Sequence, residues 1–452
     1  MRRRTLLASV GSATLAAVAG CSSVPGLDSE PAPVVDVAES ALRDEPTPPR
    51  LTGFASGEEV TLVATMTDSE GVEWRSENVF EANSDGVVDV SAQEPTDGSY
   101  DGVDPMGWLW SMTPQTSEAD ETTAFRSDGD ETEIRLAASS GDADSGPDAS
   151  VTTTRRHHAE GASRTEVDTG DLVGVYFEPA GSGPHPGALA LHGSGGSPAT
   201  NVAELLASHG YAAFAPQYFG DHDAVPNTLT HVPLGYFDGA VDWLTAKAAV
   251  EDGDVHVIGG SRGGELALLL GVHYDWPAAV VCWNGSGVAW SSPGMPSESA
   301  WSLGGEAVPF LGGNLHRGET TDDGYTALRE VTASAYEDAD EAALAEATIP
   351  VEDVGAPTLL VAGEADKLWA SALLSEHAAE RLREHDAGFG FAYESYEGAG
   401  HAFGRPYRPT HGLRAASDGG LLMGGTPAGN AAAAADAWPK VLDCFETGLG
   451  GE

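Results

Sequence analysis

The sequence predicts an α/β fold, a mostly parallel sheet with helices on both faces, preceded by a small all-β domain of the immunoglobulin-like sandwich type. Three observations lead to this prediction. The 452 residues exceed what one ordinary core contains, which favours two domains. Short alternating strands occupy residues 51–165. Apolar runs then alternate with longer helical segments over residues 166–452, a pattern typical of parallel strands connected by helices.

Residues 1–21 have the composition of an export signal. Three arginines at positions 2–4 precede the apolar stretch Leu6–Ala19, which is too short for an ordinary membrane span. The paired arginines resemble a twin-arginine signal, and Cys21 follows small residues at the expected cleavage boundary, as in a lipoprotein. We therefore expect a protein held on the extracellular face of the cell membrane by a lipid on Cys21 alone. Residues 22–50, rich in Pro, Ser, Ala and acidic residues, are expected to form a disordered tether.

Acidic residues dominate the charge of the chain. The sequence has 70 Asp and Glu against 22 Lys and Arg, a formal net charge of −48. Such a chain repels nucleic acids and anionic membrane surfaces, which excludes both as partners. The acidic residues are spread along the chain, with aromatic and β-branched residues between them, so the sequence is not that of a disordered acidic chain. The pattern indicates a solvated acidic surface suited to the high salt of a halophile.

The spacing of cysteines and histidines contains no zinc motif, and neither a metal nor another cofactor is expected. After Cys21, Cys282 and Cys444 are the remaining cysteines. Cys282 lies in an apolar run, which favours a buried free thiol, while a disulfide between the two stays open. The sequence leaves the oligomeric state open as well.

Alternation of apolar and polar residues predicts the strands of the first domain. The clearest strand covers residues 59–66, where every second side chain is apolar. Turn sequences at 68–71 and 83–86 separate it from further short strands at 72–75 and 87–90. Several short strands at this spacing indicate a β-sandwich, and no cluster of catalytic residue types accompanies them.

The second domain alternates strands and helices. The expected strands are residues 172–177, 188–191, 212–215, 255–258, 278–283, 358–362 and 391–396. The expected helices are residues 201–208, 236–249, 262–272, 371–384 and 431–445. Between residues 285 and 356 the alternation lapses into Gly/Pro/Ser-rich sequence with one acidic helix at 334–347. This excursion is expected to lie above the sheet as a cap or a wall of the site.

One strand-to-helix junction has the pattern of a nucleophile elbow, the sharp turn that exposes a catalytic serine in α/β-hydrolases. The apolar strand 255–258 runs into the sequence G-x-S-x-G, with Ser261 at its centre and a helix-forming segment behind it. Gly259 and Gly263 are expected there because the strand and helix backbones pass too close for a Cβ atom. Ser261 is therefore the candidate nucleophile.

Partners for this serine are expected after later strands, because active sites of open α/β sheets lie beyond the carboxyl ends of the strands. Asp366 and His401 each come shortly after one of the last two predicted strands. The resulting chain order, Ser, Asp, His, is that of the α/β-hydrolase fold. His401 would take the proton of Ser261 and return it to the leaving group, and Asp366 would orient the imidazole. Glu364 is the competing acid.

An oxyanion hole requires backbone N–H groups aimed at the developing negative charge. One would come from Arg262, the residue after the nucleophile, and the other from the glycine-rich loop after Leu191. We expect the amide of Ser194 there, with Gly195 as the next candidate. Phosphate binding by this loop is disfavoured, because no Gly-Lys-Ser/Thr sequence completes a P-loop.

Motifs in both halves of the chain resemble one family. The second half contains G-G-S-R-G-G-E at the elbow, G-E-A-D-K-L-W-A-S around Asp366 and E-G-A-G-H at His401, and the first half contains D-P-M-G-W-L-W-S-M at residues 104–112. These motifs resemble the acyl-CoA thioesterase and bile acid-CoA:amino acid N-acyltransferase (BAAT) family over roughly Leu51 to Leu449. The resemblance implies that the two predicted domains are the N-terminal and the C-terminal catalytic domain of that family. It also implies a Ser or Cys nucleophile that takes an acyl group from a thioester, and Ser261 resembles the hydrolase branch.

The sequence thus predicts a serine hydrolase that cleaves acyl thioesters through an acyl-enzyme on Ser261, with a small-molecule acyl ester or thioester as substrate. An extracellular carboxylesterase or dienelactone-hydrolase-like ester hydrolase is the alternative. A noncatalytic surface binding protein on the same scaffold is disfavoured, because a decayed site would have lost at least one of Ser261, Asp366 and His401.

Overall fold

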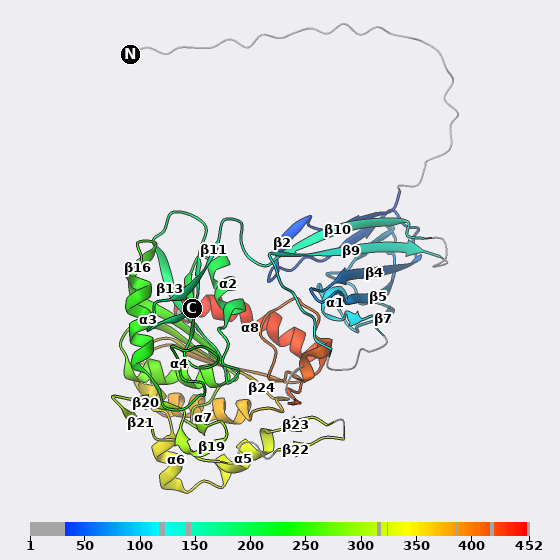
Figure 1. The fold of residues 1–452 in the computed structure, drawn as a ribbon. Helices are drawn as coiled ribbons and strands as arrows, with labels where there is room; N and C mark the ends of the chain where they lie inside the picture. Colours follow the sequence, from blue (N-terminus) through cyan, green and yellow to red (C-terminus); the bar gives the residue numbers. More distant parts are fainter. Residues whose placement is uncertain are drawn as a thin grey trace, which may run out of the picture.

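The computed structural model describes residues 32–116, 123–141, 146–313, 318–322, 324–385, 387–415 and 420–449. The predicted export signal, the lipidation site at Cys21 and the start of the predicted tether lie outside these residues. The described chain forms an all-β domain and an α/β domain that lie side by side (Figure 1). None of the helices formed by the described residues is long and apolar enough to cross a membrane.

The all-β domain contains two sheets. The larger sheet has the order β2 (Ser40–Leu42), β10 (Ala149–Arg156), β9 (Glu131–Ser140), β4 (Glu59–Thr67), β5 (Glu73–Glu81) and β7 (Asp97–Gly98), with β8 (Thr113–Pro114) paired to β5. The smaller sheet has the order β1 (Val34–Asp36), β3 (Arg50–Thr52) and β6 (Val87–Asp89). Every second side chain of β4 is buried, as its alternation predicted. Together with the short helix α1 (Gly107–Trp110), the sheets enclose one core in which Trp74, Phe80 and Trp108 are fully buried.

The predicted tether and domain boundary both need correction. Two strands, β1 and β2, lie inside residues 22–50, so the fold begins before residue 51. Strands of three residues are too short to show alternation, and they are held by tertiary burial of Val35 and Leu42 instead. At the other end, β11 (Ser163–Asp168) pairs with a strand of the α/β domain, which therefore begins before residue 166.

The α/β domain is built on an eight-stranded sheet in the order β11-β12-β14-β13-β16-β17-β24-β25. Its strands after β11 are β12 (Val173–Glu178), β13 (His185–Leu191), β14 (Ala212–Gln217), β16 (Val250–Gly260), β17 (Pro277–Trp283), β24 (Thr358–Gly363) and β25 (Phe391–Tyr396). The strands from β14 to β25 in this order are parallel, whereas β11 and β12 run antiparallel to their neighbours. The mostly parallel sheet agrees with the prediction.

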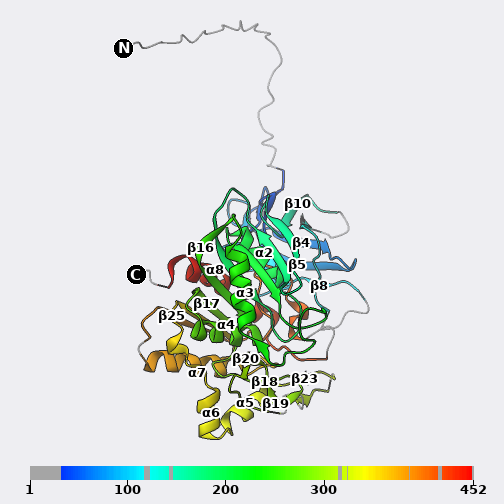
Figure 2. The same cartoon turned by 60° about the vertical axis from the view of Figure 1, so that its left-hand side comes forward.

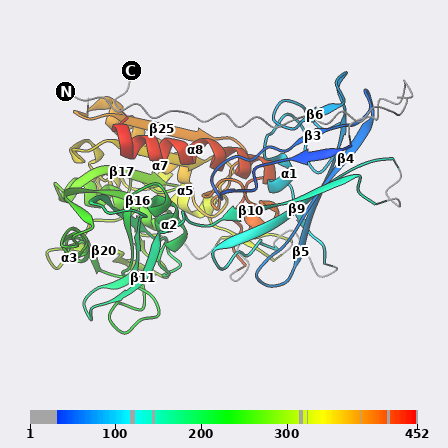
Figure 3. The same ribbon diagram turned by 90° about the horizontal axis from the view of Figure 1, so that it is seen from above.

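Helices cover both faces of this sheet, as the alternation predicted. One core includes side chains of α3 (Gly235–Thr245), α4 (Arg262–His273) and α7 (Ser371–Glu384), and the other includes side chains of α2 (Thr200–Ser208) and α8 (Pro427–Thr447). Because neighbouring side chains of a strand point to opposite faces, Leu360 belongs to the first core and Leu359 to the second. Cys282 and Cys444 lie in these two separate cores as free thiols. Figure 3 shows α8 running towards the all-β domain, whose core includes Ala431 of this helix.

The excursion after β17 packs outside the large sheet (Figure 2). Its short strands are β18 (Ser291–Ser292), β19 (Met295–Ser299), β20 (Trp301–Leu303), β21 (Glu306–Ala307), β22 (Glu319–Thr320) and β23 (Thr326–Ala327), and β20 also pairs with β15 (Val232–Pro233). The single helix predicted at 334–347 is wrong, because the chain forms α5 (Arg329–Glu337) and α6 (Glu341–Ala347) instead. Asp340 starts the second helix, since its carboxylate accepts hydrogen bonds from the amides of Ala342 and Ala343.

Candidate active site

The strand-to-helix junction at Ser261 has the backbone geometry of a nucleophile elbow. Ser261 lies between β16 and α4 with φ 56° and ψ −122°, a conformation that residues other than glycine rarely adopt. A Cβ atom at Gly259 would lie 1.9 Å from the carbonyl oxygen of Gly263, and one at Gly263 would lie 2.6 Å from that of Leu191. Close backbone approach therefore requires both glycines, as the sequence predicted.

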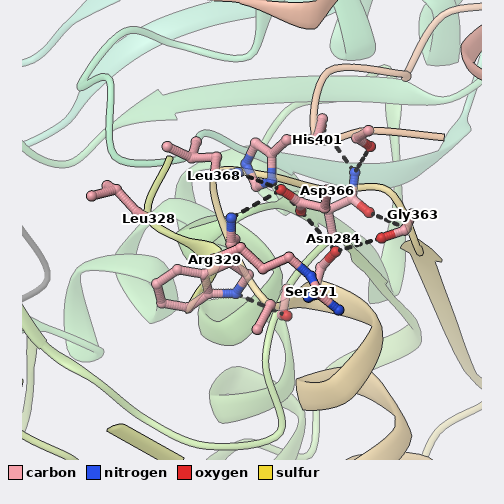
Figure 4. Close-up of polar contacts among 12 residues, drawn as sticks. Asn284, Leu328, Arg329, Gly363, Asp366, Leu368, Ser371 and His401 are labelled. Atoms are coloured by element: carbon pink, nitrogen blue, oxygen red, sulfur yellow. Dashed lines mark hydrogen bonds and ion pairs between the residues drawn. The ribbon is translucent and has the colours of Figure 1, made fainter. Parts of the chain in front are cut away.

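Asp366 and His401 meet beyond the carboxyl ends of β24 and β25. These neighbouring strands are parallel, so the turns after them lie at the same edge of the sheet. His401 Nδ1 lies 2.7 Å from Oδ2 of Asp366 (Figure 4). Because a carboxylate only accepts hydrogen bonds, Nδ1 carries the proton and Nε2 is left as a proton acceptor.

The Asp366 carboxylate is buried and held by several donors besides the imidazole. Its Oδ1 accepts hydrogen bonds from the amides of Leu368 and Trp369, both at 2.9 Å, and its Oδ2 accepts one from Ser371 Oγ at 2.7 Å. These contacts fix both oxygens and hence the direction of the bond to the histidine. Glu364, the competing acid, is exposed and accepts a hydrogen bond from a serine of β25 at 2.7 Å. Asp366, and not Glu364, is therefore the acid that contacts the imidazole of His401.

Asn284 is a positioning residue to which the sequence assigned no role. It follows β17 directly and has φ 48°. Its Nδ2 donates to the carbonyl oxygen of His401 at 2.9 Å, and its Oδ1 accepts from the amide of Gly363 at 2.9 Å. Asn284 thereby ties the loop of the base to the strand end that precedes the acid. Its place directly after a central strand was visible in the sequence, but its two partners were not.

Ser261 and His401 line one cavity of about 360 Å³. Its apolar wall is formed by Ala199, Val202, Ile258, Trp283, Phe403 and Trp438. No described residue of the excursion 285–356 lines this cavity, and its role as a cap stays a prediction. Within the described chain, no hydrogen bond joins Ser261 Oγ to His401, and such bonds are often long in ligand-free enzymes.

The glycine-rich loop after β13 places a different residue beside the nucleophile than expected. A Cβ atom at Gly193 would lie 3.1 Å from the Cβ atom of the nucleophile, whereas Ser194 and Gly195 do not line the cavity. The loop is anchored by His192, whose ring stacks on Tyr218 with centroids 3.8 Å apart and whose carbonyl accepts a hydrogen bond from the Tyr218 hydroxyl. Burial lowers the pKa of His192 to about 4, so its ring stays neutral at neutral pH.

The side chain of Arg262 has a structural role that the sequence did not reveal. Its Nε lies 3.0 Å from Oε2 of Glu265, and the two side chains are only 3% and 0% exposed. Glu265 Oε1 also accepts hydrogen bonds from the Trp290 amide at 3.1 Å and the Trp301 indole at 2.7 Å. Burial lowers the pKa of Arg262 and raises that of Glu265, and their mutual attraction opposes both shifts. The ion pair in the first turn of α4 therefore connects this helix to Trp290 and Trp301 of the excursion, close to the nucleophile in the chain.

Comparisons with known proteins match both domains. The family model for the BAAT / acyl-CoA thioester hydrolase C terminal matches residues 232–451, and that for the acyl-CoA thioester hydrolase/BAAT N-terminal region matches residues 44–169. Acyl-coenzyme A thioesterase 1 of Homo sapiens is 30% identical over 430 residues, which cover 92% of this chain and 97% of that protein. Peroxisomal succinyl-coenzyme A thioesterase of Mus musculus is 28% identical over 416 residues, which cover 90% and 94%.

Among solved structures, an acylaminoacyl peptidase of Pyrococcus horikoshii aligns with a TM-score of 0.40 at 13% identity, covering 90% of this chain and 60% of that one. The sequence matches include both domains in the same order and nearly the whole length of the relatives, and they show the family. This chain belongs to the acyl-CoA thioester hydrolase/BAAT family.

Proposed function

We propose that this chain hydrolyses acyl thioesters through an acyl-enzyme on Ser261, with His401 as the base and Asp366 as the residue that orients it. The observation that carries the proposal is the 2.7 Å contact between His401 and Asp366 on a cavity that Ser261 also lines. Relatives named acyl-coenzyme A thioesterases, which align along nearly their whole length, support a thioester as the substrate.

The chemistry follows from the placement of these groups. His401 Nε2 accepts the Ser261 proton while Oγ attacks the thioester carbonyl carbon, and the carbonyl oxygen becomes an oxyanion. The amides of Arg262 and Gly193 are the proposed donors to that oxyanion. The carbon–sulfur bond then breaks, and the leaving thiolate takes the proton from His401. Water next attacks the acyl ester and gives its proton to His401; release of the acid returns that proton to Ser261.

Replacement of the nucleophile tests this proposal. Ser261→Ala is expected to lower kcat for thioester hydrolysis at least about a thousandfold. A sulfonyl fluoride should label Ser261 in the parent protein and leave the variant unlabelled. The exposed Ser163 offers a matched control, and Ser163→Ala should keep both activity and labelling. Full activity of Ser261→Ala would end the proposal.

The choice between thioester and ester is tested by comparing substrates. A thioesterase should show a higher kcat/KM for a palmitoyl thioester than for short p-nitrophenyl esters. The reverse order would favour the extracellular carboxylesterase or dienelactone-hydrolase-like alternative.

We further propose that residues 1–21 direct export and that Cys21 carries the lipid, from the arginine pair and the small residues before Cys21. Cys21→Ser should move the protein from the membrane fraction to the soluble fraction, and an unchanged distribution would contradict the anchor. The net charge of −48 supports a halophilic source. The protein should then unfold at low salt and refold in molar salt, whereas indifference to salt would contradict that source.

A further inference from the structure

Arginines gather where the two domains meet beside the catalytic cavity, although the chain has a net charge of −48. Arg43 and Arg155 come from the all-β domain, and Arg405 and Arg408 come from the segment that follows His401. All four arginines line a small cavity between the domains. Arg405 lines that cavity and the catalytic cavity as well.

Three of these arginines donate hydrogen bonds to protein groups, although the buried Nε of each has no partner among the described residues. Arg43 forms an ion pair with a glutamate at 2.6 Å, Arg155 donates to a threonine hydroxyl at 2.7 Å, and Arg408 donates to a backbone carbonyl at 3.2 Å. The side chain of Arg405 differs, because it forms no hydrogen bond or ion pair with any residue that the structure describes. Arg405 therefore lines the catalytic cavity without a hydrogen bond or ion pair to any described carboxylate.

The surroundings of Arg405 make an anionic ligand the natural partner. A guanidinium stays protonated in proteins, and a charge withdrawn from water is costly unless it is paired. Arg405 is partly buried, and burial followed by the positive charges of Arg408 and Arg43 lowers its pKa. The carboxylate of Glu204, which pairs with Arg43, opposes that shift in part. The described lining of the catalytic cavity contains neither Asp nor Glu. A bound ligand is thus the remaining source of a negative charge on the cavity side.

We propose that Arg405 binds an anionic group of the substrate, a carboxylate or a phosphate, and thereby selects charged thioesters for attack by Ser261. The proposal rests on the proposed thioesterase function. A guanidinium can donate two parallel hydrogen bonds to the oxygens of either group. Because Arg405, Ser261 and the apolar wall share one cavity, the charged group and the reacting carbonyl carbon can belong to one molecule. The anionic group can lie in the acyl half or in the thiol half of that molecule. Thioesters that carry the charge in only one half distinguish these two cases.

Turnover of three thioesters tests the selection. Butyryl-N-acetylcysteamine is neutral, succinyl-N-acetylcysteamine has a carboxylate in the acyl half, and butyryl-CoA has phosphates in the thiol half. Arg405→Met should lower kcat/KM roughly ten- to hundredfold for at least one charged thioester while changing the neutral one less than about threefold. Arg405→Lys should recover part of the loss. A loss confined to succinyl-N-acetylcysteamine identifies a carboxylate, one confined to butyryl-CoA identifies a phosphate, and a loss for both shows that Arg405 serves either.

The control is Arg164→Met, because Arg164 is exposed on β11 and pairs with Glu166. This variant should keep all three activities. Equal losses for all three substrates in Arg405→Met, or no loss for any of them, would overturn the proposal.

A binding measurement separates this proposal from the thioesterase proposal. Titration calorimetry of Ser261→Ala with CoA and with succinate needs no turnover. Adding Arg405→Met to this variant should weaken the binding of at least one of them about tenfold or more. If the parent protein hydrolyses no thioester but Arg405→Met still weakens binding in this way, the thioesterase function is refuted and the anion site is retained. Absent binding, or equal binding with and without Arg405, would refute the anion site.

Discussion

Replacement of Asn284 tests whether one side chain holds the loop of the base in place. The Asn284 side chain donates to the His401 carbonyl oxygen and accepts from the Gly363 amide, each at 2.9 Å, and it also donates to the Gly400 carbonyl oxygen at 3.5 Å. The two shorter hydrogen bonds carry the expected effect. Each bond stabilises the fold by about 1 kcal/mol, and the buried Gly363 amide left without an acceptor adds about 1–2 kcal/mol. Asn284→Gly is therefore expected to lower the free energy of unfolding by about 3–4 kcal/mol.

Alanine at the same position adds a backbone term. Asn284 has φ 48°, a left-handed conformation that costs an alanine about 1–2 kcal/mol, whereas glycine adopts it freely. The smaller entropy of the unfolded alanine chain returns about 0.4–1 kcal/mol. The central values of these two ranges make Asn284→Ala about 0.8 kcal/mol less stable than Asn284→Gly.

Denaturant unfolding at constant molar salt measures these differences, and thioester hydrolysis measures their effect on catalysis. Displacement of a catalytic group by about 1 Å costs up to about a hundredfold in rate, so kcat should fall roughly ten- to hundredfold in both variants. The exposed Asn227 provides the control, and Asn227→Ala should match the parent in stability and kcat. Parent-like stability and kcat in both Asn284 variants would refute the positioning role. A glycine variant less stable than the alanine variant would refute the backbone argument.

Three further predictions concern the stability of the fold. Glu265→Gln leaves the buried Arg262 without its anion and should lower the free energy of unfolding by about 3–5 kcal/mol in a denaturant titration. The control Glu166→Gln, at an exposed ion pair, should lower it by less than about 1 kcal/mol. Similar losses in the two variants would contradict the role of burial. Gly259→Ala would place a Cβ atom 1.9 Å from a carbonyl oxygen, so no native circular dichroism spectrum is expected, and a folded variant would show that the elbow can shift. Burial lowers the pKa of His157 from 6.5 to about 4. Between these two pH values the unfolded chain binds more protons than the folded chain, so the free energy of unfolding should fall as the pH falls from 6.5 to about 4. His157→Gln should reduce that slope by up to about 1.4 kcal/mol per pH unit in denaturant titrations at several pH values, and an unchanged slope would contradict the assignment.

Local sequence patterns were enough to predict the elbow at Ser261 and its candidate partners Asp366 and His401. The glycines around Ser261 are required by backbone contacts within one strand-turn-helix unit, and such contacts leave a pattern in consecutive residues. Asp366 and His401 could be predicted because parallel strands bring their carboxyl ends to one edge, so that position after a strand indicates position in space. The long amphipathic and apolar segments were predicted for the same reason, since their periodicity is a local property.

Residues whose roles depend on distant partners could not be predicted in this way. The His401 carbonyl and the Gly363 amide that Asn284 contacts lie 117 and 79 residues away in the chain. The two strands β1 and β2 were missed because three residues are too few to show alternation and their stability comes from packing in the all-β core. The loop after β13 was predicted, but only the structure shows that His192 in this loop stacks on Tyr218 and that Gly193 lies beside the nucleophile.

By itself, the sequence determined the fold class, the serine elbow, the order of its candidate partners and the resemblance to the acyl-CoA thioester hydrolase/BAAT family. The tertiary structure alone decided which side chains surround the substrate cavity, because its lining comes from several strand ends, loops and helices that are far apart in the sequence. Arg405 shows the difference most clearly. In a sequence with 70 acidic and 22 basic residues it is one arginine among many, and only the folded chain shows that it lines the catalytic cavity, whose described lining contains no acidic residue.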